Sequence, residues 1–134
     1  MAMAFVYLSA FSQGKAPLPV SKAFEQKFPD AKKVKWEKEK GNTFEAKFWL
    51  NGKECTANFT ASGEWLETES EMSQPELPEA VLSSFNLNHK GAFIKEVSKI
   101  ELNNGSLTYE IEMKKGIKTV ELNYSSDGKE SKGK

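Results

Sequence analysis

The feature that most limits the fold is an internal repetition. A short helical segment led by Leu-Pro is followed by stretches in which apolar and polar residues alternate, and this order occurs twice, starting at 18–19 and at 77–78. The clearest match is between Phe-Glu-Ala-Lys-Phe at 44–48 and Tyr-Glu-Ile-Glu-Met at 109–113. The repetition predicts one supersecondary unit used twice.

The spacing of apolar residues predicts the elements of each unit. Val20, Phe24 and Phe28 fall at helical spacing, and so do Val81 and Phe85, each behind a proline that suits the first turn of a helix. After each helix the period changes to two, with turn signals such as Asn-Gly at 51–52. Such alternation is typical of antiparallel sheets with one buried face. We predict that the buried positions include Phe48, Phe59, Tyr109 and Leu122.

These elements predict an α+β fold built as a tandem repeat. Each unit is a helix followed by a three- to four-stranded antiparallel sheet, αβββ(β) twice, with the helices packed on one face of the sheet. The first unit covers residues 13–76 and the second covers 77–129, while 130–134 form a polar tail. Periodicity leaves open whether the two sheets are continuous.

The N-terminus resembles a secretory signal. Residues 3–11 carry no charge and are followed by small residues, so we expect 1–12 to be a signal peptide or its remnant, cleaved before Gln13. No basic residue precedes the apolar run, which leaves an N-terminal strand or amphipathic cap as the alternative. The run is shorter than the roughly 20 apolar residues that span a bilayer, so no membrane span is expected.

Composition excludes several classes of partner. Acidic and basic residues number 19 each, whereas nucleic-acid-binding proteins usually carry a basic excess on one face. The same balance gives no reason to expect binding to an anionic membrane surface. One cysteine and one histidine support neither an internal disulfide nor a zinc site, so we expect no cofactor and no metal.

Three groups of residues are catalytic candidates by their chemistry. His89 follows a predicted helix end and is expected to be a solvated loop histidine, and Cys55 is in phase with buried positions and is expected to be inert. Glu110 and Glu112 lie two apart on one strand face. They read either as a solvated, salt-bridged surface or as the acid and base of a carboxylate-based hydrolase. The first reading is favoured, and we expect no enzyme.

Trp49 departs from its local pattern. Its neighbours Phe48 and Leu50 belong to the face that is expected to be buried, so Trp49 should face solvent with Glu45 and Lys47. Exposed aromatic side chains often carry binding energy. We therefore predict a partner-binding surface at Trp49 with Trp65 beside it. The alternative is that Trp49 packs against Trp65, the linker or the second unit.

The strand and turn motifs of the first unit resemble the PepSY-like family of β-lactamase-inhibitor-like secreted proteins. The resemblance rests on a Pro-led helix that ends in Phe-Pro at 28–29, Val34 and Trp36, Phe-Glu-Ala-x-Phe at 44–48, Asn-Gly at 51–52, Ala-x-Phe at 57–59 and Ser-Gly-x-Trp at 62–65. It extends over about 17–129. The second unit has Val97 in place of the first-strand tryptophan and lacks the Phe-Pro helix end.

The resemblance implies a function without catalysis. It implies a secreted protein of Bacteroidetes type, in the periplasm or cell envelope, that binds another protein or peptide and inhibits or regulates a secreted hydrolase. The alternatives are an envelope-associated structural or peptide- or glycan-binding protein and, less favoured, a carboxylate-based hydrolase. The sequence leaves the partner and the oligomeric state open, although an open sheet leaves edges through which copies can pair.

Overall fold

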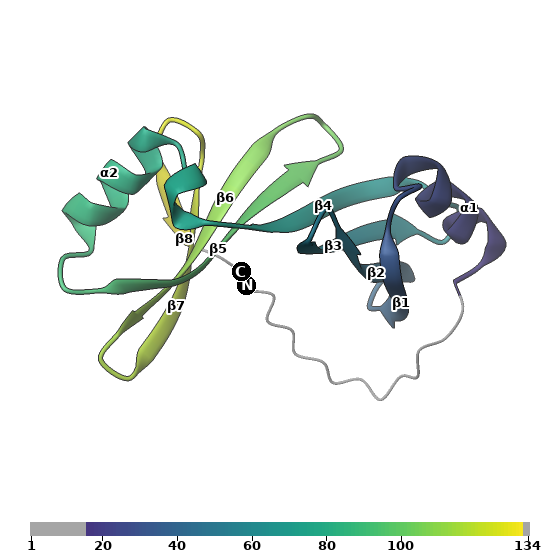
Figure 1. Ribbon diagram of the computed structural model, residues 1–134, viewed down its shortest axis with the longest axis horizontal. Helices are drawn as coiled ribbons and strands as arrows, with labels where there is room; N and C mark the ends of the chain where they lie inside the picture. Colours follow the sequence, from purple (N-terminus) through teal and green to yellow (C-terminus); the bar gives the residue numbers. More distant parts are fainter. Residues whose placement is uncertain (1–15, 133–134) are drawn as a thin grey trace. The chain divides into compact units, whose positions relative to one another are not determined.

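The computed structural model describes residues 16–132, so the predicted signal segment at 1–12 lies outside the described part. The elements follow in this order: α1 (Leu18–Lys27), β1 (Lys32–Glu39), β2 (Thr43–Leu50), β3 (Lys53–Thr60), β4 (Trp65–Met72), η1 (Gln74–Glu76), α2 (Glu79–Asn88), β5 (Phe93–Leu102), β6 (Leu107–Lys115), β7 (Lys118–Tyr124) and β8 (Glu130–Lys132) (Figure 1). No helix within this part is long and apolar enough to cross a membrane.

The predicted fold class is wrong. Residues 16–132 form mostly a single eight-stranded antiparallel sheet with the order β1-β2-β3-β4-β5-β6-β7-β8, accompanied by two α-helices of ten residues each, rather than a helix-plus-sheet unit used twice. The physical reason is that alternation fixes which way side chains point and says nothing about which strand edges pair. A strand edge presents unpaired N–H and C=O groups, which joining a larger sheet satisfies.

Residue contacts divide the described chain into two compact units, which are considered separately. The first unit comprises 16–70 and 102–104, and the second comprises 71–101 and 105–132. Each contains one α-helix and its own apolar core. The two similar stretches of the sequence therefore each supply the buried residues of a separate core.

The core of the first unit lies between α1 and the strands that follow it (Figure 1). Val20 and Phe24 are the buried residues of α1, and Phe48 and Phe59 from β2 and β3 are fully buried, as predicted. The helix ends where the backbone N–H of Phe28 donates to the carbonyl of Phe24 at 2.8 Å. Pro29 follows and cannot donate the next helical hydrogen bond.

The core of the second unit is built around α2. The predicted buried residues Tyr109 and Leu122 are 9% and 2% exposed, which confirms their phase. The rest of this core comes from the helix and its strands: Leu77, Val81, Phe85, Val97, Ile111, Met113 and Tyr124. Alternation therefore fixed the buried face correctly in both units.

A glycine in the turn after β3 allows the chain to pass close to the start of α1. Gly63 has φ +96°, and a Cβ at this position would lie 2.6 Å from the Pro19 carbonyl oxygen. Gly128 stands in the same relation to Ala80 of α2, with a Cβ-to-oxygen distance of 2.5 Å. Both contacts are with backbone, which cannot move aside as a flexible side chain can.

We expect Gly63→Ala to lower the free energy of unfolding by roughly 3 kcal/mol. The new methyl group would clash with the Pro19 carbonyl oxygen, and the backbone at residue 63 has a left-handed conformation that alanine disfavours. Gly41→Ala is the matched control, since Gly41 has φ +76° but no atom within 4 Å of an added Cβ. It should cost only about 1 kcal/mol. Urea unfolding measures both. Equal losses would show that the close approach contributes nothing.

Candidate functional site

The face of β1–β3 that points away from α1 is the candidate site, and we call it the outer face. Its side chains alternate with the core positions and come from three strands: Lys35, Glu37, Glu45, Lys47, Trp49, Glu54 and Asn58. The register places Trp49 opposite Glu54 of β3 and opposite Lys32 of β1. Trp49 is 41% exposed, so it faces solvent as its phase indicates.

Trp49 borders a hollow at the end of β2. The hollow has a volume of about 480 Å³ and is lined by Trp49, the β2–β3 turn at 51–52 and the segment 29–32. Asp30, Lys32 and Asn51 are the polar residues of this lining. An aromatic surface beside a few polar groups is a common composition for binding sites.

A cluster of carboxylates occupies the other half of the outer face. Oxygen atoms of Glu37, Glu39 and Glu45 lie within 4.8 Å of one another. Glu37 is directly opposite Glu45 in the β1–β2 register, so the cluster contains a cross-strand pair of like charges. Asn58 is opposite Glu45 on β3, and its Oδ1 atom is buried without a hydrogen bond.

The environment of Glu45 changes its acidity. Burial raises its pKa to about 7, and repulsion from Glu39 and Glu37 adds to the rise, while Lys47 opposes it. The Nζ atom of Lys47 lies 3.9 Å from Oε2 of Glu54. Near neutral pH the carboxyl of Glu45 therefore exchanges a proton readily, and a cationic group arriving on this face would favour its ionised form.

Carboxylates of this kind are also potential ligands of a hard cation. Calcium takes six to eight oxygen atoms in flexible geometry, whereas this cluster offers three carboxyl groups. The arrangement is better described as a region of negative potential than as a metal centre. Alternation along one strand does not predict this cluster, although the Gly41-Asn42 turn sets a register in which Glu37 lies opposite Glu45.

The structure does not bring the two predicted site residues together. Trp65 is opposite Phe59 and packs on the core side, whereas Trp49 is opposite Glu54 on the outer face. Five residues of β3 separate the two positions, or about 17 Å along the strand. The Trp65 Nε1 atom donates to Thr68 Oγ1 at 2.8 Å, and Lys27 Nζ lies 3.8 Å from the indole centroid.

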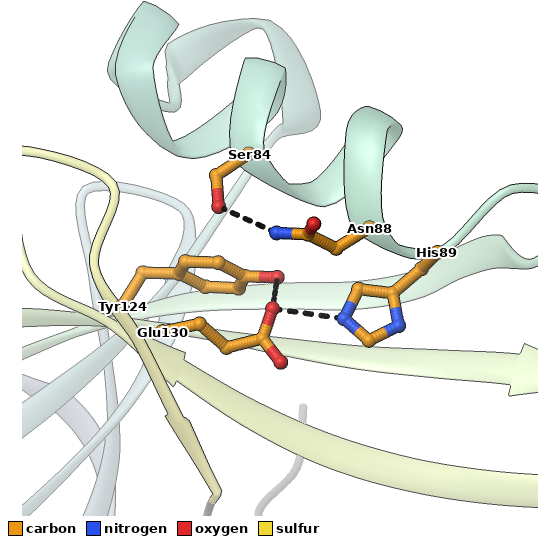
Figure 2. A network of polar contacts seen from close by, with 5 residues as sticks. All are labelled: Ser84, Asn88, His89, Tyr124 and Glu130. Carbon is orange, nitrogen blue, oxygen red and sulfur yellow. Dashed lines mark hydrogen bonds and ion pairs between the residues drawn. The ribbon is translucent and has the colours of Figure 1, made fainter.

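His89 is not the solvated loop histidine that the sequence indicated. It caps the C-terminus of α2, its ring stacks on Phe85 with centroids 5.4 Å apart, and its Nε2 atom is 2.8 Å from Glu130 Oε1. The hydroxyl of Tyr124 donates to the same oxygen at 2.8 Å (Figure 2). Glu130 lies 41 residues from His89, in a segment expected to be a tail, and belongs to β8.

This network has the composition of a catalytic site but the geometry of a structural one. Tyr124 is fully buried, and burial together with the hydrogen bond to Glu130 raises its pKa. The hydroxyl is therefore kept protonated and out of reach of a substrate. The Nδ2 atom of Asn88 donates to Ser84 Oγ at 3.4 Å, beside the network rather than within it (Figure 2).

The remaining catalytic candidates also take structural places. Cys55 is 3% exposed and belongs to the first core, which confirms that it is buried. Glu110 was expected to be solvated and is 8% exposed, with Ser98 Oγ donating to its Oε1 atom at 3.5 Å. Phase alone could not predict this burial, because it depends on what covers the strand. Glu112 is opposite Glu96 and Glu121 in the register.

Comparison with known proteins gives one family and several similar structures. A family profile described as "Putative beta-lactamase-inhibitor-like, PepSY-like" matches residues 42–131. No curated protein matches the chain.

The similar crystal structures include two proteins from Bacteroides. A "putative periplasmic" protein from Bacteroides eggerthii is 21% identical with a TM-score of 0.82, and the match covers 89% of this chain and 90% of that one. A BLIP-like protein from Bacteroides fragilis is 27% identical with a TM-score of 0.76, over 90% of this chain and 86% of that one. The fold described above is therefore shared with both.

The raised pKa of Glu45 predicts a pH dependence of stability. A carboxyl that titrates near 7 in the folded chain and near 4.5 when unfolded binds its proton more tightly in the folded state. Stability should therefore fall as pH rises from 4.5 to 7. Glu45→Gln mimics the protonated form, so it should raise the free energy of unfolding by roughly 2 kcal/mol at pH 8 and change it little at pH 4.5.

Urea unfolding at the two pH values measures this effect. Glu101→Gln, at an exposed position of β5, is the control for loss of one negative charge. A gain at pH 8 no larger than that of Glu101→Gln would contradict the raised pKa of Glu45.

Removing Glu130 should leave the buried Tyr124 hydroxyl without its acceptor. We expect Glu130→Ala to lower the free energy of unfolding by about 2 kcal/mol. The double variant Glu130→Ala with Tyr124→Phe should lose less than the sum of the two single changes, because it leaves no orphaned donor. Strict additivity in this double-mutant cycle would show that the hydrogen bond is unimportant.

Proposed function

The chain belongs to the PepSY-like, β-lactamase-inhibitor-like family, as its strand and turn motifs predicted, and from this membership we propose that it is a periplasmic binding module without catalytic activity. Its partner is another protein, bound through the outer face of β1–β3. The similarity to a Bacteroides protein described as BLIP-like supports a protein-binding role, and the similarity to one described as periplasmic supports the location.

The observation that carries the proposal is the exposure of Trp49. Leaving 41% of a tryptophan in water forgoes part of the roughly 2–3 kcal/mol that burial of a large apolar side chain provides. A rigid indole loses little conformational entropy when a partner covers it. The adjoining hollow and the carboxylates of the same face give this surface both shape and charge.

The described residues also favour binding over hydrolysis. Within residues 16–132, the histidine and the cysteine are both committed to structural contacts, the first with Glu130 and the second in the core. Glu110 is buried rather than lining an open cleft. Inhibition or regulation of a secreted hydrolase is the form of binding that the family description suggests.

We expect Trp49→Ala to leave the melting temperature nearly unchanged and to abolish capture of the partner from a Bacteroides periplasmic fraction. Trp49→Phe should retain part of the capture, because it keeps an aromatic surface. Ile117→Ala is the control, since Ile117 is a large apolar residue that is 97% exposed on the β6–β7 turn.

Mass spectrometry identifies the captured protein, and calorimetry with the purified pair gives the affinity. A stable Trp49→Ala protein that captures its partner at full strength would eliminate the proposed surface. A loss of stability of about 3 kcal/mol or more would instead mean that Trp49 has a packing role.

A further inference from the structure

The edge strand β1 carries charged residues that lie opposite like charges on β2. In the β1–β2 register, Lys35 is opposite Lys47 and Glu37 is opposite Glu45. Both are cross-strand pairs of like charge, which destabilise a sheet when directly opposed. Within residues 16–132, neither Lys35 nor Glu37 forms an ion pair.

The edge of β1 that points away from β2 pairs with no strand within residues 16–132. β1 is the first strand in the sheet order, so β2 is its only neighbour there. The strand begins with Lys32, Lys33 and Lys35, and both of its acidic residues, Glu37 and Glu39, lie at its other end on either side of Lys38. A strand with this order of charges is complementary to a second copy of itself in the antiparallel direction.

We infer that two copies of this chain associate through antiparallel pairing of their β1 strands, with Trp36 at the twofold axis. In this register Lys35 of each copy lies opposite Glu37 of the other, on the outer face. The interface is isologous, as a closed dimer requires. The ammonium group of Lys35 from the second copy would then approach the carboxylate cluster of Glu37, Glu39 and Glu45.

The face of β1 that points toward α1 supports the same pairing. A hollow of about 490 Å³ lies between α1 and β1, with an aromatic wall formed by Phe24, Phe28 and Trp36. Val34 also lines it and is 37% exposed. In the proposed register Val34 is opposite Lys38 of the second copy, whose aliphatic stem can cover it while the ammonium group stays in water.

A bulge limits the length of the pairing. The register shifts between Lys32 and Lys35, and Lys33 has φ +57°. Bulges and lysines are devices that restrain edge-to-edge association. The regular part of β1 is therefore short, and the dimer is a weak, concentration-dependent one that does not extend into a fibre, because the twofold pairing uses up the β1 edge of both copies.

The test is a set of charge reversals in the full chain, measured by sedimentation velocity over a wide concentration series. Lys35→Glu alone and Glu37→Lys alone each place like charges opposite one another across the dimer, so the dissociation constant should rise about tenfold. The double variant Lys35→Glu with Glu37→Lys should restore the wild-type value. An equimolar mixture of the two single variants should form a heterodimer.

Stability separates this effect from misfolding. Each single reversal converts a like-charge pair within the chain, with Lys47 or with Glu45, into an opposite-charge pair. The melting temperature should therefore stay the same or rise while the association weakens. Lys118→Glu and Glu101→Lys, at exposed positions of β7 and β5, are controls with the same changes of charge and should leave the dissociation constant unchanged.

Three results would overturn the inference. The first is a wild-type chain that stays monomeric at every concentration. The second is a double variant as weak as the single ones, together with a mixture that does not associate. The third is a loss of association in the two control variants equal to that in the β1 variants, which would show that only net charge matters.

Discussion

The packing of Phe24 against the sheet is the interaction on which the first unit depends. Its ring centroid lies 5.3 Å from those of Phe28 and Trp36, 5.0 Å from that of Phe48 and 6.2 Å from that of Phe59. One side chain of α1 thus touches rings from β1, β2 and β3, mostly in edge-to-face geometry. Because these contacts fix which face of all three strands is buried, they also determine which residues reach the outer face.

Alternation within strands was the part of the structure that could be predicted from the sequence. The burial of Phe48 and Phe59 and the solvent-facing position of Trp49 all follow from a period of two, since adjacent side chains of a strand point in opposite directions. The family could be predicted as well, because its motif consists of core and turn residues. A role for Trp49 in binding remains a prediction.

The misses share a cause, which is that they depend on pairs distant in the sequence. Nothing periodic connects His89 with Glu130, and β8 is too short to show alternation. The single sheet could not be predicted, because the alternation within a strand shows which of its faces is buried and does not show which strands pair. The carboxylate cluster was accessible in principle, since the turn between β1 and β2 fixes the register that places Glu37 opposite Glu45.

The order of strands in the sheet has a consequence for the rate of folding. The spatial order β1 to β8 repeats the order along the chain, so each strand pairs with its neighbours in sequence. Turns join these pairs, except that β4 and β5 are joined through η1 and α2. Folding rates fall as the mean sequence separation of contacts increases. This sheet should therefore form faster than a Greek-key sandwich of equal length, by adding one strand after another from an initial hairpin.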